Sequence, residues 1–162
     1  MTDCNPTKPE DVHELSITRH IAAPPEKVWR VITEQTAQWW CPTPWRTEII
    51  EQDWRSGGRN ATVMLGPDGE REEGEGIFLE VKPGQRFVFT DAMTADFEPQ
   101  GPFMIGIFAI EAEDDGTRYT ASARHWTEEA KKQHEEMGFF AGWTAVSDQL
   151  AELCENEMAD II

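Results

Sequence analysis

The sequence predicts an α+β fold in which a curved antiparallel sheet of about seven strands wraps around a long C-terminal helix. Two observations support this prediction. Near the start, a strand-like segment leads into a proline pair and two short helical segments, and near the end an amphipathic helical segment follows the last strand. Between them, almost every pattern is that of a strand or a turn. The 162 residues suit a single domain, with a core over residues 14–154 and an N-terminal tail over residues 1–11.

The first strand is expected over Glu14–Ile21, where apolar and polar residues alternate imperfectly. The pair Pro24-Pro25 follows, and proline is favourable at a helix start because its fixed φ suits the helix and its missing N–H is not needed there. A helix is therefore predicted over Pro25–Glu34. Its apolar residues at helical spacing are Val28, Trp29 and Ile32. This face is expected to pack against the sheet.

A short helical turn at Thr36–Trp40 ends where two prolines forbid its continuation, and six strand-like segments follow it. These segments are Trp45–Trp54, Arg59–Leu65, Glu75–Val81, Arg86–Asp91, Phe103–Glu111 and Thr117–Trp126. Short turns rich in Gly, Pro and Asp join most of them, whereas parallel pairing needs a long crossover connection. The sheet is therefore predicted to be an antiparallel meander.

The longest irregular connection is Ala92–Pro102. A connection of this length has two interpretations, because long loops are either functional elements or ordinary surface links. The segment is accordingly a lid at the mouth of a cavity or a plain hairpin loop.

A helix is predicted from Thr127 to the end of the core. Thr127 is the expected N-cap, and Glu128 and Glu129 fall in the first turn, where carboxylates interact favourably with the helix dipole. The apolar stripe of this helix consists of Phe139, Trp143, Val146, Leu150 and Leu153. Because these residues recur at three- and four-residue steps, they lie on one side, and the helix is expected to fill the concave side of the sheet.

The chain is strongly acidic, with 31 Asp and Glu residues against 14 Lys and Arg and a formal net charge of −17. This charge repels phosphate backbones and anionic lipids, so neither nucleic acid nor membrane is an expected partner. It serves solubility or forms an acidic face for a basic partner. No apolar stretch approaches the ~18 residues of a membrane span. The polar N-terminus and three cysteines without a C-x-x-C pair favour a cytoplasmic location.

Seven short motifs are more specific in their order and spacing than any one of them alone. They are IAAPPEKVWRVIT, QWWCP at Gln38–Pro42, Gly57-Gly58, PDGE at Pro67–Glu70, GIFLEVKPGQRFVFT, GTR at Gly116–Arg118 and MGFFAGW at Met137–Trp143. In this order the chain, over Ser16–Leu153, resembles the heat-shock protein 90 ATPase activator homologue family, a branch of the START-like (SRPBCC) helix-grip superfamily.

The resemblance implies a curved antiparallel sheet that grips the C-terminal helix, in agreement with the pattern of strands. It implies no single activity, because the branch includes co-chaperone domains, bacterial proteins of unknown role and self-sacrificing resistance proteins. The wider superfamily adds polyketide cyclases and lipid binders.

A cavity between the sheet and the terminal helix is the main functional expectation. In the last strand Tyr119, Ala121, Ala123 and His125 share one face. If that face points inward, the two alanines leave room for a ligand beside the helix. The other expected wall residues are Trp40, Phe78, Phe89, Phe108, Met137, Phe140 and Trp143. The alternative is a solid core in which the aromatic rings fill the space.

Catalytic candidates are few, and enzyme activity is not favoured. His125 is a general base or hydrogen-bonding group at one end of the cavity, or else a satisfied structural histidine. Glu75 shares a strand face with Ile77 and Leu79, and burial of that face would raise its pKa. His125 and His134 do not match the spacing of zinc ligands, so no metal is expected. The Gly-Glu-Gly sequence around Glu75 lacks the rest of a dinucleotide fingerprint, so no cofactor is expected.

The segment Phe103–Ile110 is apolar on both faces, although a single-layer sheet needs only one apolar face. The second face predicts a protein interface, with a symmetric homodimer as the simplest form.

Three hypotheses follow for the whole chain. The preferred one is a cavity that binds a small apolar or aromatic molecule; the others are a co-chaperone-like domain with a chaperone partner and a cyclase- or hydrolase-type enzyme.

Overall fold

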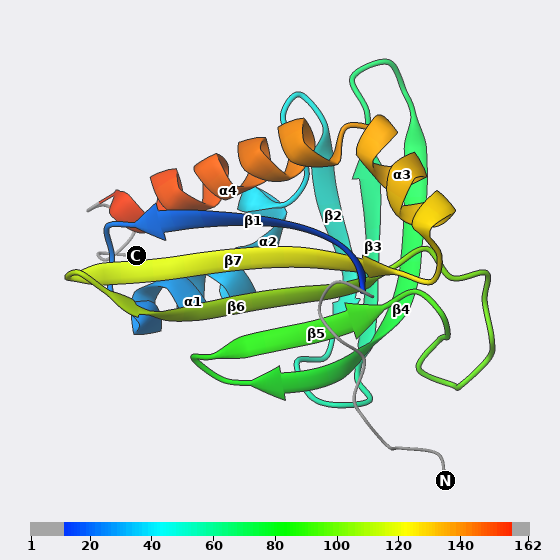
Figure 1. Cartoon of the computed structure of the whole chain (residues 1–162), viewed down its shortest axis with the longest axis horizontal. Helices are drawn as coiled ribbons and strands as arrows, with labels where there is room; N and C mark the ends of the chain where they lie inside the picture. Colours follow the sequence, from blue (N-terminus) through cyan, green and yellow to red (C-terminus); the bar gives the residue numbers. More distant parts are fainter. Residues whose placement is uncertain (1–11, 157–162) are drawn as a thin grey trace, which may run out of the picture.

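The computed structural model describes residues 12–156, which form one curved seven-stranded sheet and four helices (Figure 1). The elements are β1 (His13–Ile21), α1 (Pro25–Glu34), α2 (Thr36–Trp39), β2 (Arg46–Gln52), β3 (Arg59–Leu65), β4 (Arg71–Lys82), β5 (Arg86–Thr90), β6 (Ile105–Glu113), β7 (Gly116–His125), α3 (Glu128–Glu136) and α4 (Phe139–Glu155). The predicted α+β helix-grip architecture is confirmed. None of the helices in this part of the chain is long and apolar enough to cross a membrane.

The sheet is antiparallel throughout, in the order β1-β7-β6-β5-β4-β3-β2. Strands β2 to β7 form the predicted meander, and β1 pairs with the far edge of β7 so that His13 lies opposite His125. The first strand of the chain thus stands at one edge of the sheet and the second strand at the other.

A bulge in β4 changes which residues face the core. The register between β4 and β5 shifts between Phe78 and Glu80. Strict alternation would put Ile77 and Leu79 on one face, but Ile77 and Phe78 are both buried and Leu79 is 41% exposed. The extra residue of a bulge interrupts the two-residue period, which is why the alternation expected from the sequence does not hold here.

The helices close the concave side of the sheet. Helix α4 packs along β1 at one edge, α2 contacts β2 at the other edge, and α2 and α4 contact each other (Figure 1). The core between helices and sheet includes Val28, Val31 and Ile32 of α1 and Phe139, Trp143, Val146 and Leu150 of α4. Full burial of each such side chain contributes about 1.5–3 kcal/mol. Four of the five residues in the predicted stripe of the terminal helix are therefore core residues.

The C-terminal helical region is two helices and not one. Thr127 caps α3 as expected, since its Oγ1 accepts a hydrogen bond from the Ala130 N–H at 3.0 Å. The helix ends before Gly138, whose φ of +100° is a left-handed conformation that stops a right-handed helix and that glycine adopts without strain. Helix α4 starts at the next residue in a new direction. The short connection between β7 and α3 places His134 of α3 beside His125, the last residue of β7.

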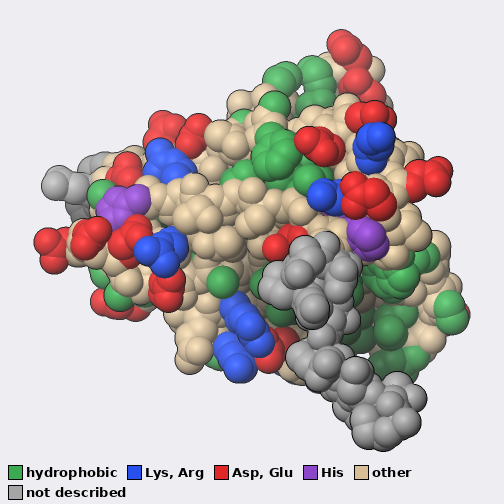
Figure 2. All heavy atoms as spheres, in the orientation of Figure 1, with side chains coloured by type: hydrophobic (Ala, Val, Ile, Leu, Met, Phe, Trp, Pro, Cys, Tyr) green, Lys and Arg blue, Asp and Glu red, His purple; other side chains and the backbone are tan. Residues whose placement is uncertain are grey.

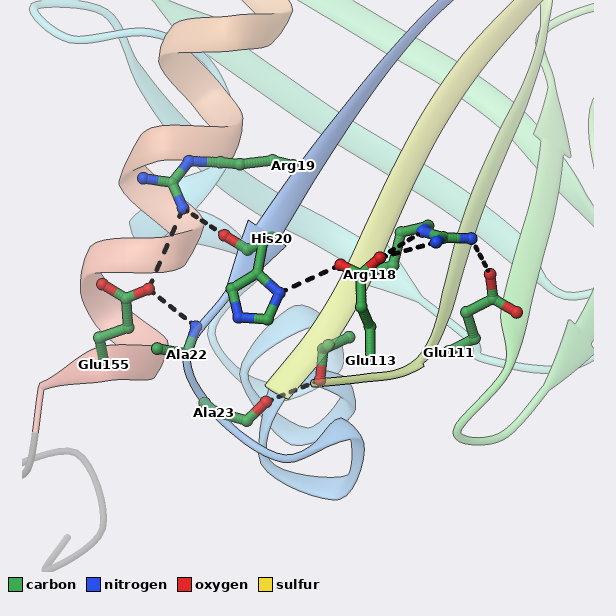
Figure 3. Close-up of polar contacts among 9 residues, drawn as sticks. Arg19, His20, Ala22, Ala23, Glu111, Glu113, Arg118 and Glu155 are labelled. Carbon is green, nitrogen blue, oxygen red and sulfur yellow. Dashed lines mark hydrogen bonds and ion pairs between the residues drawn. The ribbon is translucent and has the colours of Figure 1, made fainter. Parts of the chain in front are cut away.

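A polar network ties three chain segments together at the other end of the sheet (Figure 3). Arg118 pairs with Glu113 at 2.7 Å across the β6–β7 hairpin, and Glu113 also accepts a hydrogen bond from His20 at 3.1 Å. These two hydrogen bonds, first that from His20, hold the pKa of the Glu113 carboxyl below its usual value. Glu155 of α4 accepts a hydrogen bond from the Ala22 N–H at 2.9 Å. The end of β1 is thereby fixed to the hairpin and to α4.

Candidate functional site

A pocket of about 580 Å³ lies between the sheet and the helices. Its walls come from β3, β4, β5 and β6 on the sheet side and from α2, α3 and α4 on the helix side. A pocket of this volume falls within the 300–1,000 Å³ that is typical of small-molecule sites. The residues of the polar network in Figure 3 are not part of its walls.

Aromatic rings form most of the apolar wall. Trp40, Phe108 and Trp143 contact one another, with ring centroids 5.8 Å apart for Trp40 and Phe108, 5.8 Å for Trp40 and Trp143, and 5.3 Å for Phe108 and Trp143. Phe108 also stacks on Phe87 at 4.9 Å. These are the offset and edge-to-face arrangements that aromatic pairs prefer. The rings contact one another, so the wall is already formed without a ligand.

Helix α4 holds the segment that carries Trp40. The Gln149 amide nitrogen donates to the backbone oxygens of Trp39 and Cys41 at 3.0 and 3.1 Å, and its amide oxygen accepts from the Thr43 N–H at 3.0 Å. One side chain thus satisfies three backbone groups of the turn after α2. Cys41 is buried there, and burial raises the pKa of its thiol, which makes it a poor nucleophile at neutral pH.

Gly106 determines the position of Phe89. The two residues lie opposite each other on β6 and β5, and a Cβ on Gly106 would come within 2.4 Å of the Phe89 ring. The missing side chain therefore lets the ring of Phe89 lie across β6 and contribute to the pocket wall. The glycine at this point of an otherwise apolar strand has a specific packing role.

Two histidines form a hydrogen-bonded chain at one end of the pocket. The Nδ1 atom of His125 lies 3.1 Å from the backbone oxygen of His13, and its Nε2 atom lies 2.8 Å from Nδ1 of His134. A carbonyl oxygen only accepts, so Nδ1 of His125 carries a proton. In the neutral ring Nε2 then accepts, and Nδ1 of His134 must be the donor. The remaining nitrogen of a neutral His134, Nε2, is therefore an acceptor.

His134 lies in an apolar environment. Its ring centroid is 4.5 Å from Phe103, 5.1 Å from Phe139 and 6.0 Å from Trp143, and the residue is 7% exposed. Desolvation, and to a lesser extent the neighbouring His125, lowers the pKa of His134 to about 4. His134 is consequently neutral near pH 7.

Carboxylates occur on the sheet side of the pocket, but the candidate Glu75 is not an acid with a raised pKa. Arg59 donates to both of its carboxylate oxygens, at 2.9 and 2.8 Å. These hydrogen bonds lower the pKa of Glu75, although burial opposes them. The side chain is therefore ionised and fixed by its partner, because a bidentate arginine stabilises the charged form of a carboxyl group.

The pocket margin is acidic. Glu72 and Glu73 are exposed at the start of β4, and Asp91 accepts hydrogen bonds from the Phe103 and Met104 N–H groups at 2.8 and 3.3 Å. The wall contains no Lys or Arg within the described part of the chain. On the face shown in Figure 2, acidic side chains are widely spread, with Lys and Arg side chains between them.

The structure places the predicted cavity residues in two groups. Trp40, Phe89, Phe108, Met137 and Trp143 line the pocket, as does Glu75. Phe78, Tyr119, Ala121 and Ala123 belong to the packed core instead. The alanines do share a buried face of β7, but they belong to one core cluster with side chains of α1, α4 and β6 and do not line the pocket. Phe140 is 45% exposed and does not line the pocket, and His125 reaches it only through His134.

Several residues of the pocket wall were not assigned to the cavity from the sequence, among them Trp54, Phe87, Phe103 and His134. Of these four, His134 is the one with a titratable side chain. It was considered only as a zinc ligand together with His125, and the spacing of the two argued against that role. Within residues 12–156 no group of three or more His, Cys, Asp or Glu side chains is arranged to hold a metal ion. The contact between the two rings depends on how α3 folds back against the end of β7, which the spacing of the two residues in the sequence does not reveal.

The two surface predictions concern the loop after β5 and the outer face of β6. The loop Ala92–Pro102 does not line the pocket, and Gln100 anchors it through hydrogen bonds to the backbone oxygens of Glu75 and Asp91 at 2.9 and 3.0 Å. On β6, Ile105 and Ile107 are half-buried. The homodimer through this strand stays a prediction.

Comparison with known proteins gives one family. The model of the family "Activator of Hsp90 ATPase homolog 1-like protein" matches residues 22–155. A crystal structure of a protein from Nitrosomonas europaea is 38% identical, with a TM-score of 0.85 over 90% of this chain and 96% of the other. A protein from Mycobacterium smegmatis is 29% identical, with a TM-score of 0.74 over 88% and 91%.

The AHSA1 protein from Silicibacter pomeroyi is 25% identical, with a TM-score of 0.63 over 86% of this chain and 95% of the other. No curated protein matches the chain. The names of these three structures describe no ligand and no reaction.

Proposed function

The chain belongs to the family of activator of Hsp90 ATPase homolog 1-like proteins, and from this premise we propose that it binds a small, largely apolar or aromatic molecule. The binding site is the pocket between the sheet and helices α2, α3 and α4. The proposed role is that of a binding module, since the catalytic candidate Glu75 is fixed in its ionised form by Arg59 and does not suit proton donation.

The observation that supports the proposal best is the preformed aromatic wall around Trp40, Phe108 and Trp143. An aromatic group buries about 150–250 Å² on complete enclosure. At about 25 cal/mol per Å², this corresponds to about 4–6 kcal/mol of favourable transfer free energy before the entropy of binding is subtracted. Because the rings already support one another, little of this energy is needed to organise the wall.

Charge narrows the class of ligand. The wall holds the carboxylates of Glu72, Glu73, Glu75 and Asp91 and, in the described residues, no Lys or Arg. An anionic ligand would meet the carboxylates of the pocket wall and the net charge of −17, and Arg59, a cation beside the wall, is already paired with Glu75. The proposed ligand is therefore neutral or cationic.

A substitution that fills the pocket tests the proposal. Gly142 lines the pocket on α4, and a Cβ added there would meet only the Cγ atom of Pro42, at the ordinary contact distance of 3.9 Å. Gly142→Phe should place a ring in the pocket and also favour the helix, since glycine is a poor helix former. Thr144→Phe is the matched control because Thr144 is exposed on the same helix and does not line the pocket.

The measurement is the fluorescence titration of each protein with the neutral probe N-phenyl-1-naphthylamine, accompanied by native mass spectrometry of the freshly purified wild type. We expect saturable binding to the wild type and to Thr144→Phe, and binding at least tenfold weaker to Gly142→Phe. Equal affinity of the three proteins, or no saturable binding to the wild type, would contradict the proposal. Extra mass that disappears on denaturation would reveal the size of a natural ligand.

A further inference from the structure

We infer that the pocket selects ligands that carry a hydroxyl or N–H group, because Nε2 of His134 presents a fixed hydrogen-bond acceptor at its apolar end. The inference deepens the proposed function and rests on it, since it names the chemical class of the ligand. A phenol or an aromatic alcohol is the simplest member of that class.

Among residues 12–156, Nε2 of His134 has no hydrogen-bond partner and is accessible. His134 is more than nine-tenths buried and lines the pocket. Its Nδ1 is engaged by His125, and among residues 12–156 no group forms a hydrogen bond with Nε2. Within the same residues, every fully buried side-chain nitrogen and oxygen has a hydrogen-bond partner. Nε2 is therefore in contact with space that a small molecule can enter, and the pocket is the space that His134 lines.

The backbone of β1 sets the direction of the hydrogen bond between His125 and His134. The backbone oxygen of His13 requires a proton on Nδ1 of His125. Nε2 of the neutral His125 ring is then an acceptor, so Nδ1 of His134 donates across the 2.8 Å contact and Nε2 of His134 is left as an acceptor. A ligand that offers only an acceptor, such as an ether oxygen, would leave Nε2 buried without a partner. The penalty for an unsatisfied buried acceptor is about 1–3 kcal/mol.

The aromatic rings around His134 strengthen the selection for ligands that donate a hydrogen bond. Phe103, Phe139 and Trp143 enclose the His134 ring, so water does not compete freely for Nε2 once a ligand occupies the pocket. The burial that lowers the pKa of His134 keeps Nε2 unprotonated near pH 7. The site thus combines an apolar surface for the body of the ligand with one acceptor that orients it.

The test compares three neutral probes that differ at one position: naphthalene, 2-naphthol and 2-methoxynaphthalene. Equilibrium dialysis against the wild type should give an affinity for 2-naphthol about tenfold higher than for 2-methoxynaphthalene. His134→Phe retains the aromatic packing and removes the acceptor, so 2-naphthol should fall to the affinity of the methoxy compound. His20→Phe is the control, because His20 lies on the exposed part of β1 and outside the pocket.

The outcomes separate the two proposals. Equal affinities of 2-naphthol and 2-methoxynaphthalene for the wild type would overturn the inference about His134, and binding of all three probes would then leave the pocket function intact. The inference about His134 would also be overturned if the folded His134→Phe variant still bound 2-naphthol tenfold more tightly than 2-methoxynaphthalene. Failure of all three probes to bind would overturn both. The comparison of probes on the wild type needs no variant, so it remains decisive if His134→Phe does not fold.

Discussion

Acidification should destabilise this protein through His134, and the size of the effect follows from its burial. Desolvation lowers the pKa of the folded imidazole from 6.5 to about 4. Between pH 6.5 and pH 4 the unfolded chain binds a proton at His134 more readily than the folded chain does. The contribution of the neutral imidazole to the free energy of unfolding is therefore fully present above pH 6.5 and declines as the pH falls towards 4. Each pH unit in the window removes about 1.4 kcal/mol from the free energy of unfolding, so about 2 kcal/mol is lost between pH 7 and pH 5.

The assay is urea unfolding, followed by tryptophan fluorescence at pH 8, 7, 6 and 5, for the wild type and for His134→Gln. Glutamine does not titrate, and its amide N–H can donate to His125 in place of the imidazole. The carboxyl groups with lowered pKa, including Glu75 and Glu113, are present in both proteins, so their contributions cancel in the difference. The difference in unfolding free energy should change by about 2 kcal/mol from pH 8 to pH 5 in the direction that favours the variant at low pH.

Parallel curves for the two proteins would refute this reasoning. A difference that stays constant within about 0.5 kcal/mol across the four pH values would mean that the folded and unfolded states bind the proton at position 134 equally well. The burial of the imidazole among Phe103, Phe139 and Trp143 would then not exclude its charged form.

Three further substitutions test the packing, each by urea unfolding at pH 7.5. Thr117→Val removes a buried hydroxyl that donates to a backbone oxygen at 2.7 Å, and should lower the free energy of unfolding by about 1–2 kcal/mol. Gly138→Ala forces a Cβ into the left-handed conformation at φ +100° and should cost about 1–2 kcal/mol. Gly76→Ala places a Cβ 2.3 Å from the backbone oxygen of Thr90 and should cost about 3 kcal/mol by separating β4 from β5. Gly101→Ala is the control for the last two, because it has open space and no positive φ, and a loss equal to theirs would contradict the steric argument.

The elements of the fold were predictable because their signals are local. A proline pair marks the start of α1, Thr127 caps α3, and Gly-, Pro- and Asp-rich turns join the strands from β2 to β7. The break at Gly138 was missed, since a glycine within a helical pattern does not by itself reveal a positive φ. The faces of β4 were missed because a bulge depends on the pairing with β5 and not on the strand alone.

The candidate site was predictable only in its aromatic part. Trp40, Phe108 and Trp143 stood out as large rings near the expected groove, and they do line the pocket. Ala121 was expected to leave open space, but whether a small residue creates a cavity depends on which side chains reach it from other elements. Here Ala121 belongs to the packed core cluster, and the pocket lies between strands β3 to β6 and helices α2, α3 and α4.

By itself, the sequence determined the family, the α+β architecture, the meander from β2 to β7 and the net negative charge. The family follows from the order and spacing of short motifs, and the other properties follow from residue type, from short turns and from periods of two and 3.6 residues. The tertiary structure alone decided that His134 lines the pocket while its Nδ1 is bonded to His125. This arrangement needs the backbone of β1, the end of β7 and helix α3 to be in contact. The backbone oxygen of His13 sets the direction of the hydrogen bonds, and it lies more than 100 residues from His125 in the chain, so no local sequence pattern reveals it.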